Sequence, residues 1–548
     1  MMREYFKNRE NKIIWLVFAV TMIIGVSPLI SRYCINGHDI SYHLLRIESL
    51  KEGIQAGKPF LKVNVLFFGG AGYASSMFYP DLLLYIPAFL RVFGVGINAS
   101  YHIFVAICIC LCYLGTYFCT SRICGNRSAG MIGAVLITLC QYHLDDIYVR
   151  SAVGEYTAFI FIPFVIYGIY NFIYEGADKA WVLGIGLGGV LLCHVLSFMM
   201  CLLFMAVAFI VGFRDIAEKK DTIKRLLITM VCTAAITCSY WLPMLEQFAE
   251  GSFYVSEQWI EPKQEAIQIA GIFSDRFPAM GALLFAFMIP RIFISKKDDK
   301  SVKYADMLFV LGIIFSFLAS DIFPWDRAGK YLSFVQFPWR FFIMASCMLA
   351  LADAVILYAG IRKLNNEKFE TALLAVIVAA MAAGGLHTVS TDSQGYYDYS
   401  DDYFSYKPYT TQVIGGEWLP VSVKDPGLIV ELSEYMTGDE GSDIGFIREG
   451  DHIRAGVNEA YDHIDVPFIF YKGYAAFIEE NGSRYELSVT GEGRDGFVRV
   501  YTGGHTGELT VSYKGTFIQK IALIITLIST IGIAVCFFVK AKRTKNSL

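Results

Sequence analysis

The sequence is poor in charged residues for its length. Asp, Glu, Lys and Arg together make up 18% of its 548 residues, whereas about a quarter is usual in soluble globular proteins. Hydrophobic residues supply 55% of the chain, and the mean hydropathy is +0.48. A soluble fold of this composition would leave many apolar side chains in water, so the composition favours a protein whose solvent is a lipid bilayer.

Two further absences limit the partners and the chemistry. Outside the loops that flank apolar segments, no patch of basic residues interleaved with aromatic ones occurs, and the net charge is -4. Nucleic acid is therefore not an expected partner. None of the 13 cysteines falls within residues 388–514, so this polar segment is not a disulfide scaffold.

Apolar stretches recur along the chain at lengths near the ~20 residues that cross a hydrocarbon core. The first one, Ile13 to Ile30, is longer than the core of a signal peptide and lacks a small-x-small cleavage pattern, so we expect it to be retained. We predict a polytopic α-helical membrane protein with about 12 transmembrane helices. These helices cover residues 13–30, 101–120, 129–144, 156–174, 180–195, 197–213, 226–242, 278–294, 305–318, 338–359, 371–387 and 517–539.

The basic residues predict the orientation of these helices. Lys and Arg favour short cytoplasmic loops, and one alternation of sides collects about half of them in the loops that it places inside. Both termini then lie in the cytoplasm. The stretch from Pro80 to Gly94 is short and contains a second proline, and a crossing there would invert every later loop. We therefore place it at the outer surface as a juxtamembrane helix.

The hydropathy falls sharply over residues 388–514, where acidic residues outnumber basic ones by about two to one. Three runs alternate as strands do, YELSVTGE, GFVRVYTGG and GELTVSYKG, and Gly-rich turns separate them. The expected organisation is a membrane domain over 1–387, a mostly β extracytoplasmic domain over 388–514, and a last helix with a basic tail over 515–548. We expect the β domain to be a sandwich built on an antiparallel meander.

Polar residues that could carry chemistry gather in the predicted outer loops. Asp39 precedes apolar residues at helical spacing, Leu44, Leu45, Ile47 and Leu50, which predict an amphipathic helix along the bilayer surface. The candidate site residues that follow it are Asp145, Asp146, Arg150, Glu155, His194 and Arg340. Weaker candidates are Glu246, Asp321, Asp326 and Lys330.

A carboxylate beside guanidinium and imidazole groups at a bilayer surface suits an enzyme that joins an anionic lipid substrate to a hydroxyl acceptor. Arginine binds phosphate through two donors, and a carboxylate can remove the hydroxyl proton. The competing interpretation is that the acids are merely solvated and that interfacial arginine anchors the chain. Several carboxylates on one side of the membrane make a divalent metal site conceivable, but no EF-hand, HExxH or CxxC spacing is present. No cofactor is certain from the sequence.

The arrangement resembles the GT-C fold of polytopic glycosyltransferases, through the outer-loop Asp39, the FYPDLLLYIP segment and the acidic loop before the fourth helix. More narrowly, HDISYHLLRIESLKEGIQAG, GYASSMFYPDLLLYIPAFLRVFG, YWLPMLEQ, FVQFPWRF and GGEWLP resemble bacterial membrane proteins described as 6-pyruvoyl-tetrahydropterin synthase-related, relatives of YfhO-type glycosyltransferases. No zinc-type histidine cluster is present, so pterin chemistry is not expected.

The resemblance implies transfer of a sugar from a polyprenyl-phosphate donor to a cell-envelope glycan or lipid, with inversion at the sugar C1. By motif position Asp39 would be the base, and His194 and Arg340 would face the donor phosphate. Asp39 is single, and no WWD sequence occurs, so an oligosaccharyltransferase is not expected. Two alternatives stay open: a flippase or transporter for lipid-linked saccharides, for which Asp353 is the intramembrane acid, and a non-catalytic envelope scaffold.

Overall fold

A computed structural model describes residues 9–216, 218–257, 260–294, 299–363, 366–391, 395–399, 416–439 and 441–546. The chain divides into two compact units. Unit 1 comprises Met1–Ile40, Ile97–Ala234 and Trp259–Tyr399, and unit 2 comprises Ser41–Gly96, Ala235–Gln258 and Ser400–Leu548. Each unit is described by itself.

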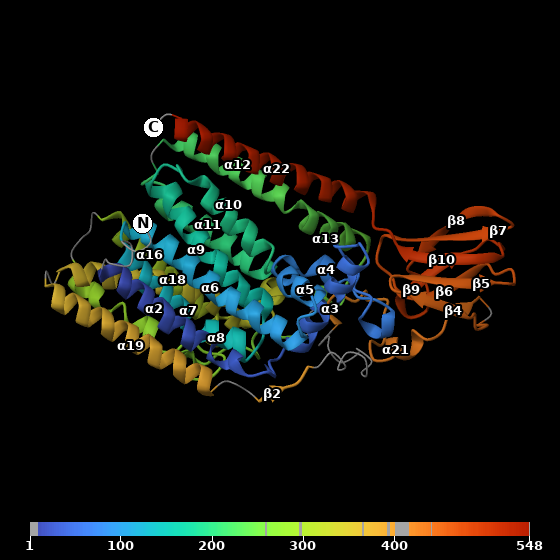
Figure 1. The fold of residues 1–548 in the computed structure, drawn as a ribbon, viewed down its shortest axis with the longest axis horizontal. Coiled ribbons are helices and arrows are strands. Elements are labelled where there is room, and N and C mark those ends of the chain that lie inside the picture. Colours follow the sequence, from blue (N-terminus) through green and yellow to red (C-terminus); the bar gives the residue numbers. More distant parts are fainter. Residues whose placement is uncertain are drawn as a thin grey trace. The chain divides into compact units, whose positions relative to one another are not determined.

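Unit 1 is a helical bundle (Figure 1). Two nearly buried helices form its centre, α9 (Val153–Tyr174) and α18 (Phe342–Lys363). The other long helices surround them: α2 (Arg9–Val26), α6 (Ile97–Cys124), α7 (Arg127–Thr138), α10 (Ala180–Leu191), α11 (Val195–Gly212), α12 (Lys219–Ile236, whose last two residues belong to unit 2), α16 (Lys300–Leu318) and α19 (Glu367–Thr391). Shorter helices are α8 (Gln141–Tyr148), α14 (Ile269–Ile272), α15 (Leu283–Ala286) and α17 (Trp325–Leu332).

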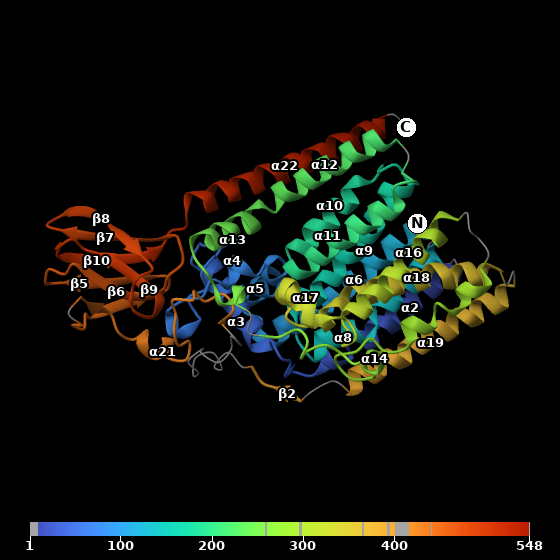
Figure 2. The ribbon, with the colours of Figure 1, turned by 180° about the vertical axis from the view of Figure 1, so that it is seen from behind.

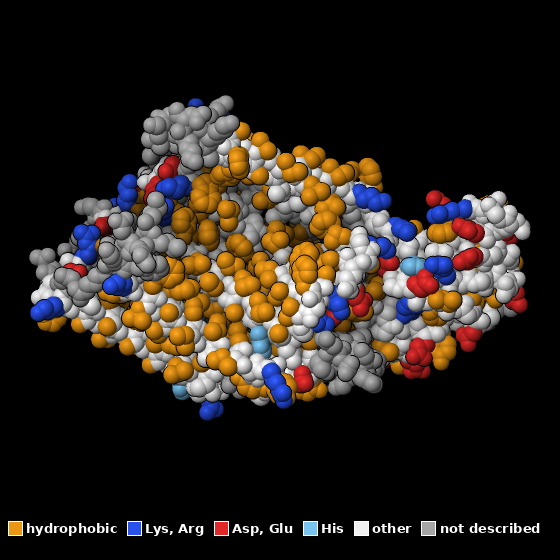
Figure 3. Space-filling model, viewed as in Figure 1, with side chains coloured by type: hydrophobic (Ala, Val, Ile, Leu, Met, Phe, Trp, Pro, Cys, Tyr) orange, Lys and Arg blue, Asp and Glu red, His pale blue; other side chains and the backbone are white. Residues whose placement is uncertain are grey.

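Small residues let the central helix α9 approach α10 closely. A Cβ added at Gly168 would lie 2.7 Å from the Leu183 Cα, and one added at Gly186 would lie 2.5 Å from the Val165 backbone nitrogen. Such contacts between backbones are typical of membrane helices, because lipid provides no hydrophobic force and association depends on close packing. On the outside, hydrophobic side chains cover the visible helical surface (Figure 3).

Eight of the described helices are long and apolar enough to cross a bilayer, or up to nine if α12 and α13 (Cys238–Glu250), which bend by 73°, form one span. The predicted count of about 12 is not confirmed. Helices α7 and α10 exist where helices were expected, but each has only 12 residues. The continuous helix expected over 278–294 is wrong: α15 and a 3-10 turn at Ile289–Phe293 replace it, because prolines and the left-handed Gly281 interrupt the chain.

Unit 2 begins with α3 (Ile40–Gln55) and short helices, α4 (Ser75–Phe78) and α5 (Tyr85–Val92), and continues with α13, α21 (Ile429–Leu432), strands β3 to β10 and α22 (Phe517–Asn546). The helix predicted after Asp39 is confirmed, but its apolar face is not free for a bilayer surface, because Leu44, Leu45, Ile47 and Leu50 are all fully buried. The buried Arg46 guanidinium fixes this helix, since it donates to Asp81 Oδ1 at 2.5 Å and to the Pro80 carbonyl.

The β domain is one antiparallel eight-stranded sheet with the order β3-β6-β9-β8-β7-β10-β5-β4 (Figure 2). Strand β8 joins its two halves, because residues 483–487 pair with β7 and residues 488–490 pair with β9. Side chains from both halves, including Ile453, Val466 and Leu509, share one core. The strands are β3 (Thr437–Gly438), β4 (Phe446–Glu449), β5 (His452–Val457), β6 (His463–Ile469), β7 (Tyr474–Glu480), β8 (Ser483–Thr490), β9 (Phe497–Tyr501) and β10 (Gly507–Tyr513).

The three predicted strands correspond to β8, β9 and β10, but the predicted meander is wrong for the last of them. Strand β10 lies between β7 and β5 and does not pair with β9. A hairpin pattern in the sequence identifies strands and turns, whereas the choice of neighbour depends on side chains from distant strands that share the core.

Candidate functional site

A tight turn places Asp39 against the segment that follows α8. The amides of His38 and Asp39 donate to the carbonyls of Val149 and Arg150 at 3.1 and 2.8 Å. Glycine is required just before this contact, because a Cβ at Gly37 would lie 2.2 Å from the Ser151 Oγ and 3.1 Å from its backbone nitrogen. The loop after the first helix and the segment before α9 are therefore joined through their backbones.

The segment carrying Asp146, Arg150 and Glu155 was expected as an outer loop whose charged side chains are candidate site residues, and the structure shows that part of it is helical. Asp146 lies on the short helix α8, Glu155 lies in the first turn of α9, and all three side chains are buried. The Arg150 Nη1 is 2.9 Å from Asp146 Oδ1 and 2.7 Å from Glu155 Oε1. Their charges are paired instead of hydrated, as burial requires.

Arg340 joins the same carboxylate from the start of α18. Its Nε is 3.2 Å from Glu155 Oε1, and its Nη1 donates to Gln336 Oε1 at 2.8 Å. Gln336 has a left-handed backbone with φ of 60°, which is costly for a residue with a side chain and turns the chain so that its amide meets Arg340. Tyr142 completes the arrangement by donating to Glu155 Oε2 at 3.1 Å. We call Asp146, Arg150, Glu155 and Arg340 the charged cluster.

Asp39 is recessed beside the charged cluster, yet its side chain is only half-buried and stays accessible. Burial raises the pKa of its carboxyl above the ordinary value, while the positive charges of Arg150 and Arg340 act in the opposite direction. Burial also lowers the pKa of the neighbouring His38, helped by Arg150. An accessible carboxylate with a raised pKa, next to two cations, has the properties of a general base near an anion site.

His194 lies in the short connection between α10 and α11, where a turn was predicted. Its Nδ1 is 2.8 Å from the Ser197 Oγ. The pKa of the imidazole is lowered to about 4, mainly by burial, while Glu155 raises it and the nearby Arg340 and Arg150 lower it. His194 is thus neutral at neutral pH and lies within electrostatic reach of the charged cluster.

Four aromatic rings line the same region. The ring of His38 is 6.0 Å from that of Phe277, which is 5.2 Å from Trp339, which is 4.9 Å from Phe337. The guanidinium carbons of Arg150 and Arg340 lie 4.4 Å above the Trp339 ring and 4.9 Å above the Phe337 ring. The sequence analysis missed these rings together with Gly37, Tyr142 and Gln336. The motif FVQFPWRF offered a signal, since four of its residues belong to this site, Gln336, Phe337, Trp339 and Arg340.

The remaining candidates lie elsewhere or have structural contacts. Asp145 is fully buried on α8, and its backbone carbonyl accepts the amides of Val149 and Arg150, which closes the turn after the helix. Glu246, in unit 2, accepts a hydrogen bond from Thr516. The other outer residues are outside the charged cluster: the Asp321 amide donates to the Ile267 carbonyl, Asp326 pairs with Lys263, and Lys330 lies over the Tyr331 ring.

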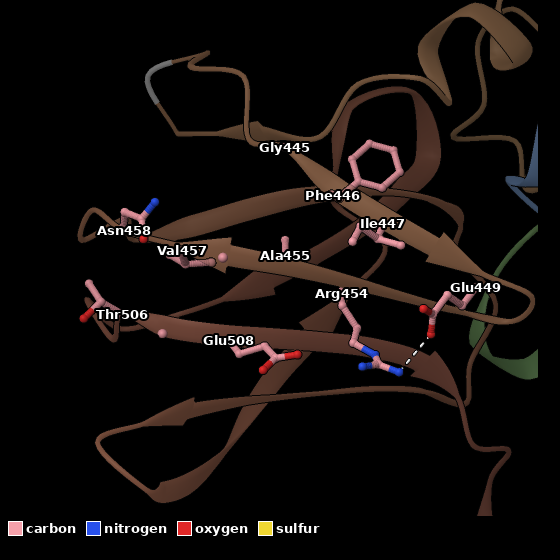
Figure 4. Close-up of a pocket in the computed structure, with 12 residues that line it drawn as sticks. Gly445, Phe446, Ile447, Glu449, Arg454, Ala455, Val457, Asn458, Thr506 and Glu508 are labelled. Atoms are coloured by element: carbon pink, nitrogen blue, oxygen red, sulfur yellow. Dashed lines mark hydrogen bonds and ion pairs between the residues drawn. The ribbon is translucent and has the colours of Figure 1, made fainter.

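Within the described ranges, no group of three or more His, Cys, Asp or Glu side chains is arranged to hold a metal ion. A cavity of about 860 Å³ lies on the β domain, far in sequence from these residues, along β4, β5 and the start of β10 (Figure 4). Its lining residues include the exposed Arg454–Glu449 ion pair and Gly456. We place the candidate chemistry at the charged cluster, because ionisable side chains from three separate segments converge there next to Asp39.

Both the fold and the site are those of a polytopic membrane protein with a C-terminal β domain and a charged cluster at the ends of its helices. Residues 76–393 match the model of a family of membrane proteins described as the 6-pyruvoyl-tetrahydropterin synthase related domain, and the chain belongs to this family. The family resemblance drawn from the sequence is thereby confirmed.

Known relatives are distant. An uncharacterized protein of Lactococcus lactis subsp. cremoris (strain MG1363) is 19% identical over 345 residues, which cover 59% of this chain and 56% of the relative. The chain therefore spans little more than half the length of this relative. Among solved structures, arabinofuranosyltransferase AftD from Mycobacteria is similar with a TM-score of 0.45 and 14% identity, over 68% of this chain and 27% of that one. The Archaeoglobus fulgidus oligosaccharyltransferase has a TM-score of 0.41 and 14% identity, over 72% and 57%.

Proposed function

We propose that the protein is a membrane glycosyltransferase that moves a sugar from a polyprenyl-phosphate donor to a hydroxyl of a cell-envelope glycan or lipid. The observation that supports this function is the accessible carboxylate of Asp39 held beside Arg150 and Arg340. Arg150 contacts two carboxylates through its Nη1, and the Arg340 Nη2 has no hydrogen bond to any described residue. A donor phosphate can therefore bind there without breaking the charged cluster.

In the proposed reaction Asp39 removes the proton of the acceptor hydroxyl, and the hydroxyl oxygen of the acceptor attacks the sugar C1. The bond between C1 and the phosphate oxygen breaks, and its electron pair stays on the polyprenyl phosphate. Arg340 stabilises the charge that develops on this leaving group, and attack from the opposite side inverts C1. Glu155 and Gln336 act as positioning residues, because they hold the guanidinium of Arg340 in place.

The most direct test replaces Asp39 with asparagine, which keeps the size of the side chain and removes the base. The purified protein in nanodiscs is incubated with undecaprenyl-phosphate sugars and envelope glycan, and transfer is followed by mass spectrometry. We expect transfer to fall by about 10²–10⁴-fold, the range for a lost general base. Asp326→Asn is the control, since this exposed acid pairs only with Lys263 among the described residues. Full transfer by Asp39→Asn would sink the proposal.

We also propose that the site faces away from the cytoplasm, as the distribution of basic residues predicts. Asp145 is buried and cannot report sidedness by labelling, whereas the side chain of Asp326 is 71% exposed. Asp326→Cys should react with a membrane-impermeant maleimide in intact cells. The exposed Lys220 lies between the helices predicted over 197–213 and 226–242, on the predicted cytoplasmic side, so Lys220→Cys should react only after permeabilisation. The reverse pattern would contradict the orientation.

One observation favours the transport alternative enough to test it. Asp353 is fully buried in α18, and neither of its carboxylate oxygens has a hydrogen-bond partner among the described residues. An ionisable group inside a membrane bundle is a functional-site candidate. One test measures whether Asp353→Asn stops lipid-linked saccharide from crossing the membrane of reconstituted vesicles, and another whether Asp39→Asn alters the envelope glycans. If transport stopped and the envelope glycans did not change, transport would replace sugar transfer as the function.

A further inference from the structure

The four rings of His38, Phe277, Trp339 and Phe337 form a continuous strip that has no role in the scheme above; we call it the aromatic strip. Successive ring centroids are 6.0, 5.2 and 4.9 Å apart, the spacing of rings in contact. Three separate segments supply them: the loop before α3, the segment before α15, and the turn before α18. One end of the strip adjoins Asp39, and the other adjoins Arg340.

Two of the four rings, Trp339 and Phe337, lie under arginine side chains, whereas Phe277 does not. Arg150 lies over Trp339 and Arg340 over Phe337, so these rings help to position the cations. Phe277 has ring contacts with His38 and Trp339 and no arginine over it among the described residues. It is half-buried, so part of its ring is accessible.

We propose that the aromatic strip is the subsite for the sugar ring of the donor, with Phe277 as the residue that contacts it. The face of a pyranose carries C–H groups with partial positive charge, which match the negative face of an aromatic ring. The sugar of a donor whose phosphate lies at Arg340 and whose C1 is approached by Asp39 must lie between these two residues, where Phe277 is. His38, Phe277 and Phe337 belong to connections outside the long helices, and Trp339 lies in the first turn of the candidate span Pro338–Lys363, so the strip lies at the end of that span.

This inference rests on the proposed function, and a binding experiment separates the two. The full-length protein in nanodiscs is titrated with undecaprenyl phosphate and with undecaprenyl phosphate carrying glucose, galactose or N-acetylglucosamine. We expect the best sugar-bearing lipid to bind about tenfold more tightly than the bare lipid, which corresponds to ~1.4 kcal/mol. Phe277→Leu should abolish this preference and leave the affinity for the bare lipid unchanged, whereas Phe277→Tyr should retain it.

Phe273 provides the matched control, because it is a nearby phenylalanine of the same unit that contacts Phe285 and is 46% exposed. Phe273→Leu should keep the preference for the sugar-bearing lipid. Equal binding of bare and sugar-bearing lipids by the wild-type protein would overturn the inference and leave the proposed function standing. An equal loss for both lipids in Phe277→Leu would also overturn it, since the ring would then only support the fold. If neither lipid bound the wild-type protein, the proposed function itself would fail.

Discussion

Replacing Glu155 with glutamine tests how much the carboxylate shared by Arg150 and Arg340 stabilises the protein. Its carboxylate is 2% exposed, and it accepts from Arg150 at 2.7 Å, Arg340 at 3.2 Å and Tyr142 at 3.1 Å. Glutamine keeps the shape but removes the charge that both guanidinium groups share. Removing one partner of a buried ion pair costs about 3–5 kcal/mol, because a charge is left without compensation. Arg150 keeps Asp146 as a partner, so we expect the lower end, about 3 kcal/mol.

The assay is unfolding of the purified protein by titration with SDS, followed by tryptophan fluorescence. Asp326→Asn is again the control, since its pair with Lys263 joins side chains that are 71% and 61% exposed, and such pairs contribute less than about 1 kcal/mol. A double-mutant cycle with Arg340→Gln isolates the shared interaction, with an expected coupling of about 0.5–3 kcal/mol. A cost for Glu155→Gln no larger than that of Asp326→Asn, or zero coupling to Arg340, would refute the reasoning.

Three further predictions concern the same region. Because the pKa of Asp39 is raised, the rate of sugar transfer should fall with decreasing pH through a value above the ordinary aspartate pKa of about 3.9, as a pH–rate profile can measure. The pKa of His194 is lowered to about 4 in the folded protein, so as the pH falls the imidazole of the unfolded chain is protonated before that of the folded chain. The folded state therefore loses stability as the pH falls from about 6.5 towards 4. Melting curves of His194→Gln should lack this pH-dependent loss of stability. In Gly37→Ala the added Cβ should clash with Ser151 and reduce both the rate of sugar transfer and the stability. In Gly184→Ala the added Cβ meets only ordinary contacts, so both quantities should stay nearly unchanged.

Several parts of the fold followed from the sequence because they depend on local or solvent-level properties. Apolar length and composition identified the eight helices that are long and apolar enough to span a bilayer, although the predicted count of about 12 is not confirmed, and alternation identified β8, β9 and β10. The turn at His194 followed from its place between two apolar stretches. The break over 278–294 was missed, although Pro278 and Pro290 are visible in the sequence, because the apolar run outweighed them in the prediction.

What only the tertiary structure decided is which groups meet and how deeply they are buried. Asp39 and Arg150 are more than a hundred residues apart, and their contact depends on a backbone pairing that Gly37 allows. The charged residues near α8 were candidate site residues in the sequence, but charge alone does not reveal that they are buried or which partners they pair with, and Arg340 comes from a third segment. The predicted meander was wrong for β10 for the same reason. Hydropathy determines how a residue relates to solvent, whereas a contact between distant residues depends on the packing of the whole chain.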